Sequence, residues 1–216
     1  MTYKAIIFDL DGTMLNTLDD LGNAMNRVLS DMGLPTHAID DYRSFIGDGV
    51  EKLIKRALPV KNRDEVTIRT CIEAFLEDYH KNWNVNTRPY EGIPALLDAL
   101  KERGLNIAVL SNKPHDTTNL CVTELLPMWR FDVVLGHRDG IPHKPDPSGA
   151  LEISKRLNIQ PEEFLYLGDS GVDMETAIAA GMFPVGVLWG FRGAEELEER
   201  GAQVLISHPL DVLNLL

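Results

Sequence analysis

A short apolar run, Ala5 to Phe8, ends on two aspartates, Asp9 and Asp11, near the start of the chain. Such a run predicts a strand buried on both faces, and carboxylates at its carboxyl end lie where open α/β sheets bind ligands. Two carboxylates this close repel each other, and oxygen-only ligands suit Mg²⁺. The alternative, a hairpin turn at Asp11-Gly12, requires a second alternating strand, whereas Thr17 to Asp20 is typical of a helix N-terminus.

The composition narrows the class of protein. The chain has 216 residues, of which 44% are hydrophobic, and this is ample for a folded core. Its formal net charge of -12 argues against binding to nucleic acid or to an anionic membrane surface. The two cysteines, Cys71 and Cys121, fall at apolar positions of expected helices, which favours buried free thiols over a disulfide. Because no apolar run is long enough for a membrane span, we expect a cytoplasmic protein.

The hydrophobic spacing changes along the chain, and this change indicates two domains. Between residues 16 and 85 the apolar residues recur at helical spacing, which predicts an all-helical module. From residue 86 to residue 216 short apolar runs alternate with helical segments, which is typical of a doubly wound parallel sheet. We therefore expect a Rossmann-like α/β core, made of residues 1–15 and 86–216, with a helical cap inserted at residues 16–85.

Three later blocks add polar residues to this picture. One expected strand ends at Ser111, where a hydroxyl and backbone N–H groups form either an anion cradle or an ordinary helix cap. Another ends before Asp169 and Asp173, which can face one point and are more than a cap requires. Lys144 lies between prolines, and by itself it would be a normal surface charge. Together the blocks indicate a metal-assisted reaction at an anionic group.

In this order the blocks resemble the signature of the haloacid dehalogenase-like superfamily of phosphohydrolases. The matching blocks are Asp9-Leu-Asp-Gly-Thr13, Ser111, Lys144 before Pro145, and Gly168-Asp-Ser-Gly-Val-Asp173. The match spans essentially the whole chain, including the inserted helical segment. Within the superfamily the chain is most similar to phosphoglycolate phosphatases, through Arg43-Ser-Phe-Ile-Gly-Asp-Gly49, Ser111-Asn-Lys-Pro114 and Trp189-Gly-Phe-Arg192. Pyrophosphatases and sugar-phosphate phosphatases share much of this second set.

The resemblance implies a Mg²⁺-dependent phosphatase that acts on a small phosphorylated metabolite through an aspartyl-phosphate. It assigns Asp9 as the nucleophile and Asp11 as the group that protonates the leaving oxygen and then deprotonates water. Mg²⁺ is expected on the Asp9 carboxylate, the Asp11 backbone carbonyl and the Asp169 carboxylate. Asp173 is expected either beside the metal or as the residue that orients Lys144.

The resemblance also implies residues that bind the substrate. Those expected around the phosphoryl group are Thr13, Ser111, Asn112 and Lys144. The cap is expected to close over the site and exclude water, with the turn Gly47-Asp48-Gly49 reaching the core. A plain turn between helices is the alternative for that segment. Candidate contacts for a substrate carboxylate are Arg43, Lys52 and Arg192.

Several other functions stay open at this point. A phosphomutase similar to beta-phosphoglucomutase shares Asp9 and Asp11, and an inorganic pyrophosphatase is a further alternative. A non-catalytic sensor of a phosphate ligand is the alternative outside enzymes. A dehalogenase is disfavoured, because carbon-halogen chemistry without a metal has no need of the acid at Asp11. We expect no nucleic-acid or membrane partner, and either a monomer or a homodimer.

Overall fold

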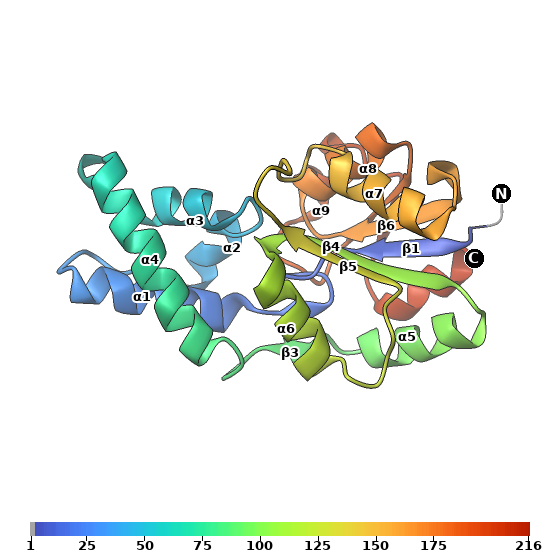
Figure 1. Cartoon of the computed structure of the whole chain (residues 1–216), viewed down its shortest axis with the longest axis horizontal. Coiled ribbons are helices and arrows are strands. Elements are labelled where there is room, and N and C mark those ends of the chain that lie inside the picture. The colour runs from blue at the N-terminus through green and yellow to red at the C-terminus, as the bar shows by residue number, and fades with distance from the viewer. Residues whose placement is uncertain (1–2) are drawn as a thin grey trace. The chain divides into compact units, whose positions relative to one another are not determined.

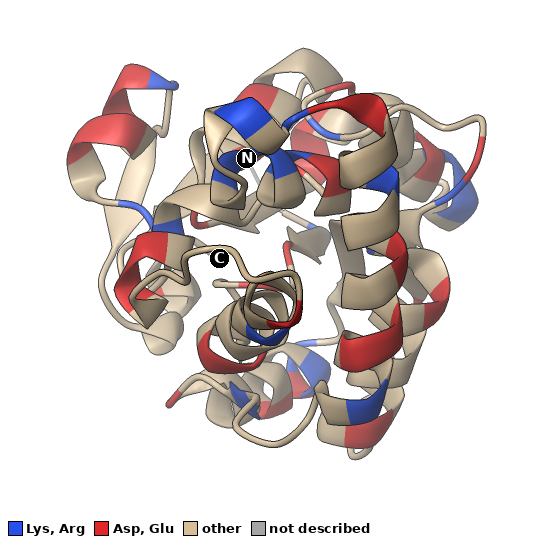
Figure 2. Ribbon diagram, turned by 90° about the vertical axis from the view of Figure 1, so that its left-hand side faces the viewer, with Lys and Arg blue, Asp and Glu red and all other residues tan. Residues whose placement is uncertain are grey.

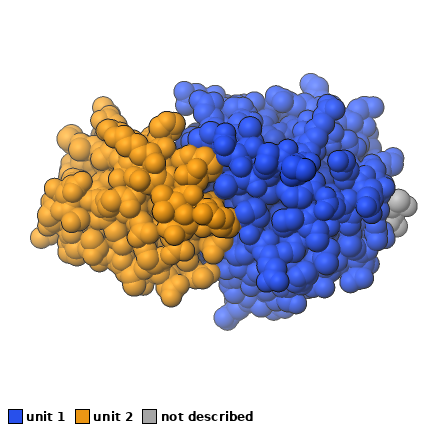
Figure 3. All heavy atoms as spheres, turned by 90° about the horizontal axis from the view of Figure 1, so that it is seen from below, with its two compact units in different colours: residues 1–15, 89–216 blue, residues 16–88 orange. Residues whose placement is uncertain are grey.

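The computed structural model describes residues 3–216, and the chain divides into two compact units (Figure 1, Figure 3). One unit comprises Met1–Leu15 and Pro89–Leu216, and the other comprises Asn16–Arg88. The sequence places the return to the first unit at residue 86, and in the structure it lies at Pro89. That the helical unit acts as a moving cap stays a prediction.

A six-stranded parallel sheet forms the centre of the first unit, with its strands in the order β5-β4-β1-β6-β7-β8. The strands are β1 (Ala5–Phe8), β4 (Asn106–Pro114), β5 (Val133–His137), β6 (Phe164–Gly168), β7 (Phe183–Val187) and β8 (Val204–Ile206). Ile7 of β1 pairs with Ala108 on one side and Tyr166 on the other. Because β1 is central and completely buried, its sequence has no polar residue.

Helices cover both faces of this sheet, as a doubly wound fold requires (Figure 1). The helices α7 (Ser148–Leu157), α8 (Gly171–Ala180) and α9 (Ala194–Glu199) lie on one face. The helices α5 (Ile93–Glu102) and α6 (His115–Leu125) lie on the other, and η4 (Pro209–Asn214) packs against α5. The predicted α/β architecture is therefore confirmed. A short 3₁₀ helix, η3 (Pro161–Glu163), precedes β6 and was not predicted.

One strand differs from its prediction in a way that matters for the site. The sequence predicts that the strand after Leu105 ends at Leu110, but β4 continues to Pro114. Its pairing with β1 reaches only Val109, and its register with β5 is irregular between Leu110 and Pro114. The residues from Ser111 to Lys113 therefore lie in an irregular part of the strand, beyond its neighbour β1.

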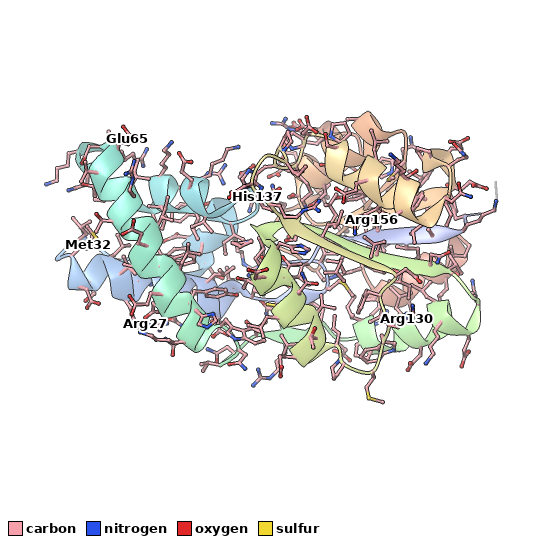
Figure 4. The ribbon with its side chains drawn as sticks, viewed as in Figure 1. Arg27, Met32, Glu65, Arg130, His137 and Arg156 are labelled. Carbon is pink, nitrogen blue, oxygen red and sulfur yellow. The ribbon has the colours of Figure 1, made fainter. Side chains whose placement is uncertain are left out.

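The second unit is built from helices. They are α1 (Leu18–Asp31), α2 (Tyr42–Phe45), α3 (Val50–Ala57) and α4 (Glu65–Asn82), with the 3₁₀ helices η1 (Ile39–Asp41) and η2 (Val60–Asn62). Arg27 of α1 donates to Asp78 of α4 at 2.9 Å, and Met32 lies 3.2 Å from Cys71, sulfur to sulfur (Figure 4). The short strands β2 (Leu15–Asn16) and β3 (Arg88–Pro89) form a separate two-stranded sheet. Among the described residues, no helix combines the length and apolar character that crossing a bilayer requires.

The N-terminus of α1 does not use the capping predicted for it. Thr17 occupies the N-cap position, but its buried hydroxyl has no hydrogen-bond partner among residues 3–216. Asp20 accepts hydrogen bonds from Asn86 and Thr87 instead of from the backbone of its own first turn. The acid therefore joins the beginning of the helical unit to its end, rather than closing a local capping box.

Candidate active site

Asp9 follows β1 directly, and the central place of this strand explains why its carboxylate is buried. The Asp9 backbone N–H donates to the Leu167 carbonyl at 2.9 Å, so the pairing of β1 with β6 continues beyond Phe8. Only 7% of Asp9 is exposed. Burial raises the pKa of Asp9 well above its ordinary value; Asp173 and Asp169 raise it further, and Lys144 opposes the rise.

Lys144 connects Asp9 to Asp173 in the interior of the site. Its Nζ donates to Asp9 Oδ1 at 2.6 Å, to Asp173 Oδ1 at 2.7 Å and to the Leu110 carbonyl at 3.2 Å. An ammonium has three N–H donors, so this buried group is fully hydrogen-bonded. Burial lowers the pKa of Lys144, but Asp173 and Asp9 outweigh it and hold this pKa well above the ordinary value. Lys144 is therefore a fixed positive charge, and the contact supports Asp173 as the residue that orients it.

The irregular part of β4 holds the Lys144 backbone in place. The Asn112 side chain accepts a hydrogen bond from the Lys144 N–H at 2.8 Å and donates to the Lys144 carbonyl at 3.2 Å. The Ser111 hydroxyl accepts from the Lys113 N–H at 3.2 Å. Ser111 and Asn112 are both buried, and their predicted contacts with a phosphoryl group stay a prediction. The prediction used the Asn112 backbone and missed this role of its amide side chain.

Asp169 is held by partners from two other loops. The Thr13 hydroxyl donates to one of its carboxylate oxygens at 3.3 Å, and the Phe191 N–H donates to the other at 2.7 Å. Gly12 has a φ of 90°, and a Cβ there would lie 2.2 Å from Asp169 Oδ2. A Cβ at Gly190 would lie 2.2 Å from the Asp169 Cβ. Both glycines therefore let the backbone approach this carboxylate closely, and Thr13 contacts Asp169.

The carboxylates of Asp9, Asp169 and Asp173 form a cluster that fits a hard divalent cation. Each offers one oxygen, and these atoms all lie within 4.8 Å of one another. Burial, followed by repulsion from Asp173, raises the pKa of Asp169 to about 7. Three ionised carboxylates beside Lys144 would leave two negative charges in excess, which a divalent cation would balance. Buried oxygen donors without sulfur or imidazole are a ligand set that suits Mg²⁺.

Asp11 lies apart from this cluster, beside a second lysine. Lys113 Nζ donates to both carboxylate oxygens of Asp11, at 3.1 and 3.2 Å, and the two side chains are 4% and 13% exposed. The sequence pattern predicts no separate role for Lys113. The available signal was its place within the block Ser111-Asn-Lys-Pro114, directly after an apolar run. The metal contact predicted for the Asp11 backbone carbonyl stays a prediction.

The remaining predicted site residues belong to the helical unit. The turn Gly47–Gly49 has positive φ angles of 116° and 90° at its two glycines. Asp48 between them accepts from Arg56 Nη2 at 2.5 Å; burial raises the pKa of Asp48, but the contact with Arg56 outweighs this and lowers it. Arg43 contacts Asp40 at 3.3 Å. Asp48 is thus paired within the helical unit, and the approach of this turn to a substrate stays a prediction.

Comparison with known proteins gives consistent matches over nearly the whole chain. The sequence model described as "Haloacid dehalogenase-like hydrolase" matches residues 6–187. A phosphoglycolate phosphatase of Aquifex aeolicus is 32% identical over 213 residues, which cover 99% of this chain and 96% of the relative. An N-acetylmuramic acid 6-phosphate phosphatase of Pseudomonas aeruginosa is 30% identical over 217 residues, covering 100% and 96%. A crystal structure from Lactobacillus delbrueckii subsp. bulgaricus, provisionally assigned as a phosphoglycolate phosphatase, has a TM-score of 0.94 and 31% identity, covering 100% of this chain and 98% of that one.

Proposed function

Because the chain belongs to the haloacid dehalogenase-like hydrolase family, we propose that it is a Mg²⁺-dependent phosphatase of a small phosphorylated metabolite, with 2-phosphoglycolate as the first candidate. One observation carries the proposal. Asp9, Asp169 and Asp173 bring three buried carboxylate oxygens within 4.8 Å of one another near the carboxyl ends of β1 and β6, and Lys144 donates to Asp9 and Asp173. This arrangement supplies a nucleophile, a site for a divalent cation and a fixed positive charge for a phosphoryl group.

In the proposed reaction a carboxylate oxygen of Asp9 attacks phosphorus, and the bond between phosphorus and the leaving oxygen breaks. Asp11 gives its proton to the leaving oxygen, and later takes a proton from the water that hydrolyses the aspartyl-phosphate. Lys144, held by Asp173 and by the Asn112 side chain, keeps its positive charge beside Asp9. A divalent cation bound by the acid cluster would neutralise phosphate charge that otherwise repels the nucleophile.

The relatives support a phosphate monoester of a carboxylic acid as the substrate. Both names, phosphoglycolate phosphatase and N-acetylmuramic acid 6-phosphate phosphatase, denote enzymes for such compounds. A sugar-acid phosphate is therefore the second candidate beside 2-phosphoglycolate. A phosphomutase, a pyrophosphatase and a phosphate sensor remain alternatives that the same assay separates, because they differ in whether inorganic phosphate is released and from which compound.

The proposal is tested by phosphate release from a generic aryl phosphate, 2-phosphoglycolate, pyrophosphate and sugar phosphates, with Mg²⁺ and with a chelator. We expect turnover with Mg²⁺ only, and its loss in Asp9→Asn. Full activity of Asp9→Asn would refute the assignment of Asp9 as the nucleophile. Transfer of the phosphoryl group to a sugar hydroxyl, without release of phosphate, would favour the mutase instead.

A further inference from the structure

A buried lysine next to the proposed general acid has no part in the mechanism described above. Lys113 is 7% exposed, and its Nζ lies 3.1 and 3.2 Å from the two carboxylate oxygens of Asp11. A positive charge is therefore held in the interior directly beside Asp11, and it acts on any charged group of a substrate that binds there.

The position of Lys113 places it on the side of the leaving group. Asp11, as proposed, gives its proton to the leaving oxygen, which requires a contact of about 3 Å. Lys113 Nζ then lies within roughly 6 Å of that oxygen, since its own contact with Asp11 also spans about 3 Å. In 2-phosphoglycolate a single CH₂ group separates the leaving oxygen from the carboxylate. A carboxylate in that position comes within reach of the ammonium.

We propose that Lys113 binds a carboxylate carried by the leaving group, and so selects phosphate esters of small hydroxy acids over esters of neutral alcohols. This inference rests on the proposed function, because it uses the role of Asp11 in that reaction. The site contains four aspartates, and an additional carboxylate would be repelled from it without a nearby cation. A neutral leaving group would not require the buried ammonium.

The backbone around Lys113 is fixed on both sides, as selective binding requires. Its N–H donates to the Ser111 hydroxyl at 3.2 Å, and its carbonyl accepts from the Thr118 hydroxyl at 3.2 Å. Gly136 on β5 packs against the same corner, where a Cβ would lie 2.6 Å from the Lys113 carbonyl oxygen. The ammonium is thus presented from a rigid part of the core.

The other candidate cations occupy different surroundings. Lys52 pairs with Asp48 and Arg43 with Asp40 inside the helical unit, and both cations are substantially exposed. Arg192 contacts Glu196 at 3.2 Å and acts electrostatically on Asp169, on the side of the acid cluster. Lys113 is the cation that contacts Asp11. This contact favours Lys113, among these cations, as the residue that binds the leaving group.

The test compares two substrates that differ in one group, 2-phosphoglycolate and 2-hydroxyethyl phosphate, in Mg²⁺. We expect the wild-type protein to have the higher kcat/KM for 2-phosphoglycolate. Lys113→Met should reduce the ratio of the two kcat/KM values by about 10- to 100-fold, the range expected when a charged hydrogen bond is lost. Lys113→Arg should keep more of that ratio, and Lys101→Met, which removes an exposed lysine from α5, should leave it unchanged.

A purely structural role of Lys113 would lower both kcat/KM values equally and leave their ratio intact, which would overturn the proposal. The proposal would also be overturned if Arg192→Met lowered the ratio of the two kcat/KM values and Lys113→Met did not. A wild-type protein that hydrolyses both substrates equally would overturn this inference and leave the phosphatase function standing.

Binding provides a readout that needs no turnover. In the Asp9→Asn background, calorimetry should give tighter binding of 2-phosphoglycolate than of 2-hydroxyethyl phosphate, and Lys113→Met should remove the difference. An unchanged difference would refute the role of Lys113 even if no substrate were turned over. Melting temperatures of each variant identify any that do not fold, and Lys113→Gln, which also removes the charge but keeps a polar side chain, then serves in place of Lys113→Met.

Discussion

Replacing Asp20 by alanine is expected to destabilise the helical unit by about 3 kcal/mol, because one buried carboxylate there accepts several hydrogen bonds from the other end of the unit. The Asn86 N–H lies 2.9 Å from the carboxylate, and the Asn86 amide donates at 2.9 Å. The N–H and the hydroxyl of Thr87 each donate at 2.8 Å. Thr87 is completely buried, so its N–H finds no water when the carboxylate is removed.

The expected size follows from these contacts. A buried donor left without an acceptor costs about 1–3 kcal/mol, and hydrogen bonds to a charged group contribute about 1.5–3 kcal/mol each without being additive. Asp20→Asn keeps one acceptor oxygen but turns an NH₂ group toward the N–H and O–H donors. The free energy of unfolding is therefore expected to fall by about 1–2 kcal/mol. Although burial raises the pKa of Asp20, the hydrogen bonds from Thr87 and Asn86 lower it below its ordinary value of 3.8.

The pH dependence has a definite sign. A lowered carboxyl pKa stabilises the folded state above the ordinary pKa, and that stabilisation is lost as the pH falls through the folded-state pKa. The difference in the free energy of unfolding between the wild-type protein and Asp20→Asn should therefore be constant between pH 5 and pH 8 and should diminish below pH 4. Urea unfolding followed by far-UV circular dichroism measures both effects.

A neighbouring acid provides the control for this experiment. Asp19 lies in the same first turn of α1 but is exposed, so Asp19→Ala removes the same charge without removing the contacts. It should change the free energy of unfolding by less than about 1 kcal/mol. Equal losses for Asp19→Ala and Asp20→Ala would refute the reasoning, because the effect would then come from helix electrostatics rather than from the buried contacts.

Two further predictions concern the acid cluster. Asp169→Asn should stabilise the metal-free protein at pH 8 by about 2–4 kcal/mol and much less at pH 5, because burial and then Asp173 raise the pKa of Asp169 to about 7. At pH 8 the wild-type protein must fold with an ionised carboxylate in a site that disfavours the charge, whereas at pH 5 the folded protein holds the neutral acid. Urea unfolding in a chelator at both pH values checks this, and a gain independent of pH contradicts it. Gly12→Ala should reduce kcat/KM by more than about 100-fold. The reason is that a Cβ at residue 12, where φ is 90°, would lie 2.2 Å from Asp169 Oδ2. Unimpaired release of phosphate by this variant would show that the close approach of the backbone to Asp169 is not required.

The strand-end carboxylates were predictable because their signal is local. An apolar run that ends on an acid specifies both the strand and the edge at which the acid lies, and this pattern predicts the positions of Asp9 and Asp169. The doubly wound topology follows in the same way from the alternation of short apolar runs and helical segments, since parallel strands require crossover helices.

The features that the sequence did not reveal depend on partners far along the chain. Asp20 looks like part of a local capping box, but its partners are Asn86 and Thr87, which no spacing rule connects to it. The contact of Lys113 with Asp11 requires β4 to continue past Leu110, whereas the polar residues Ser111 and Asn112 predict a junction between a strand and a helix at that point. Contacts between distant segments arise from the assembled sheet, so local patterns do not contain them.

The central claim is that Asp9 carries the phosphoryl group during turnover, and covalent trapping tests it most directly. The protein is mixed with 2-phosphoglycolate or an aryl phosphate in Mg²⁺, quenched with acid and reduced with borohydride, which converts an aspartyl-phosphate to homoserine. Mass spectrometry of the digested protein should place homoserine at position 9. Phosphate release under the same conditions with unmodified Asp9, or with homoserine at another position, would contradict the account.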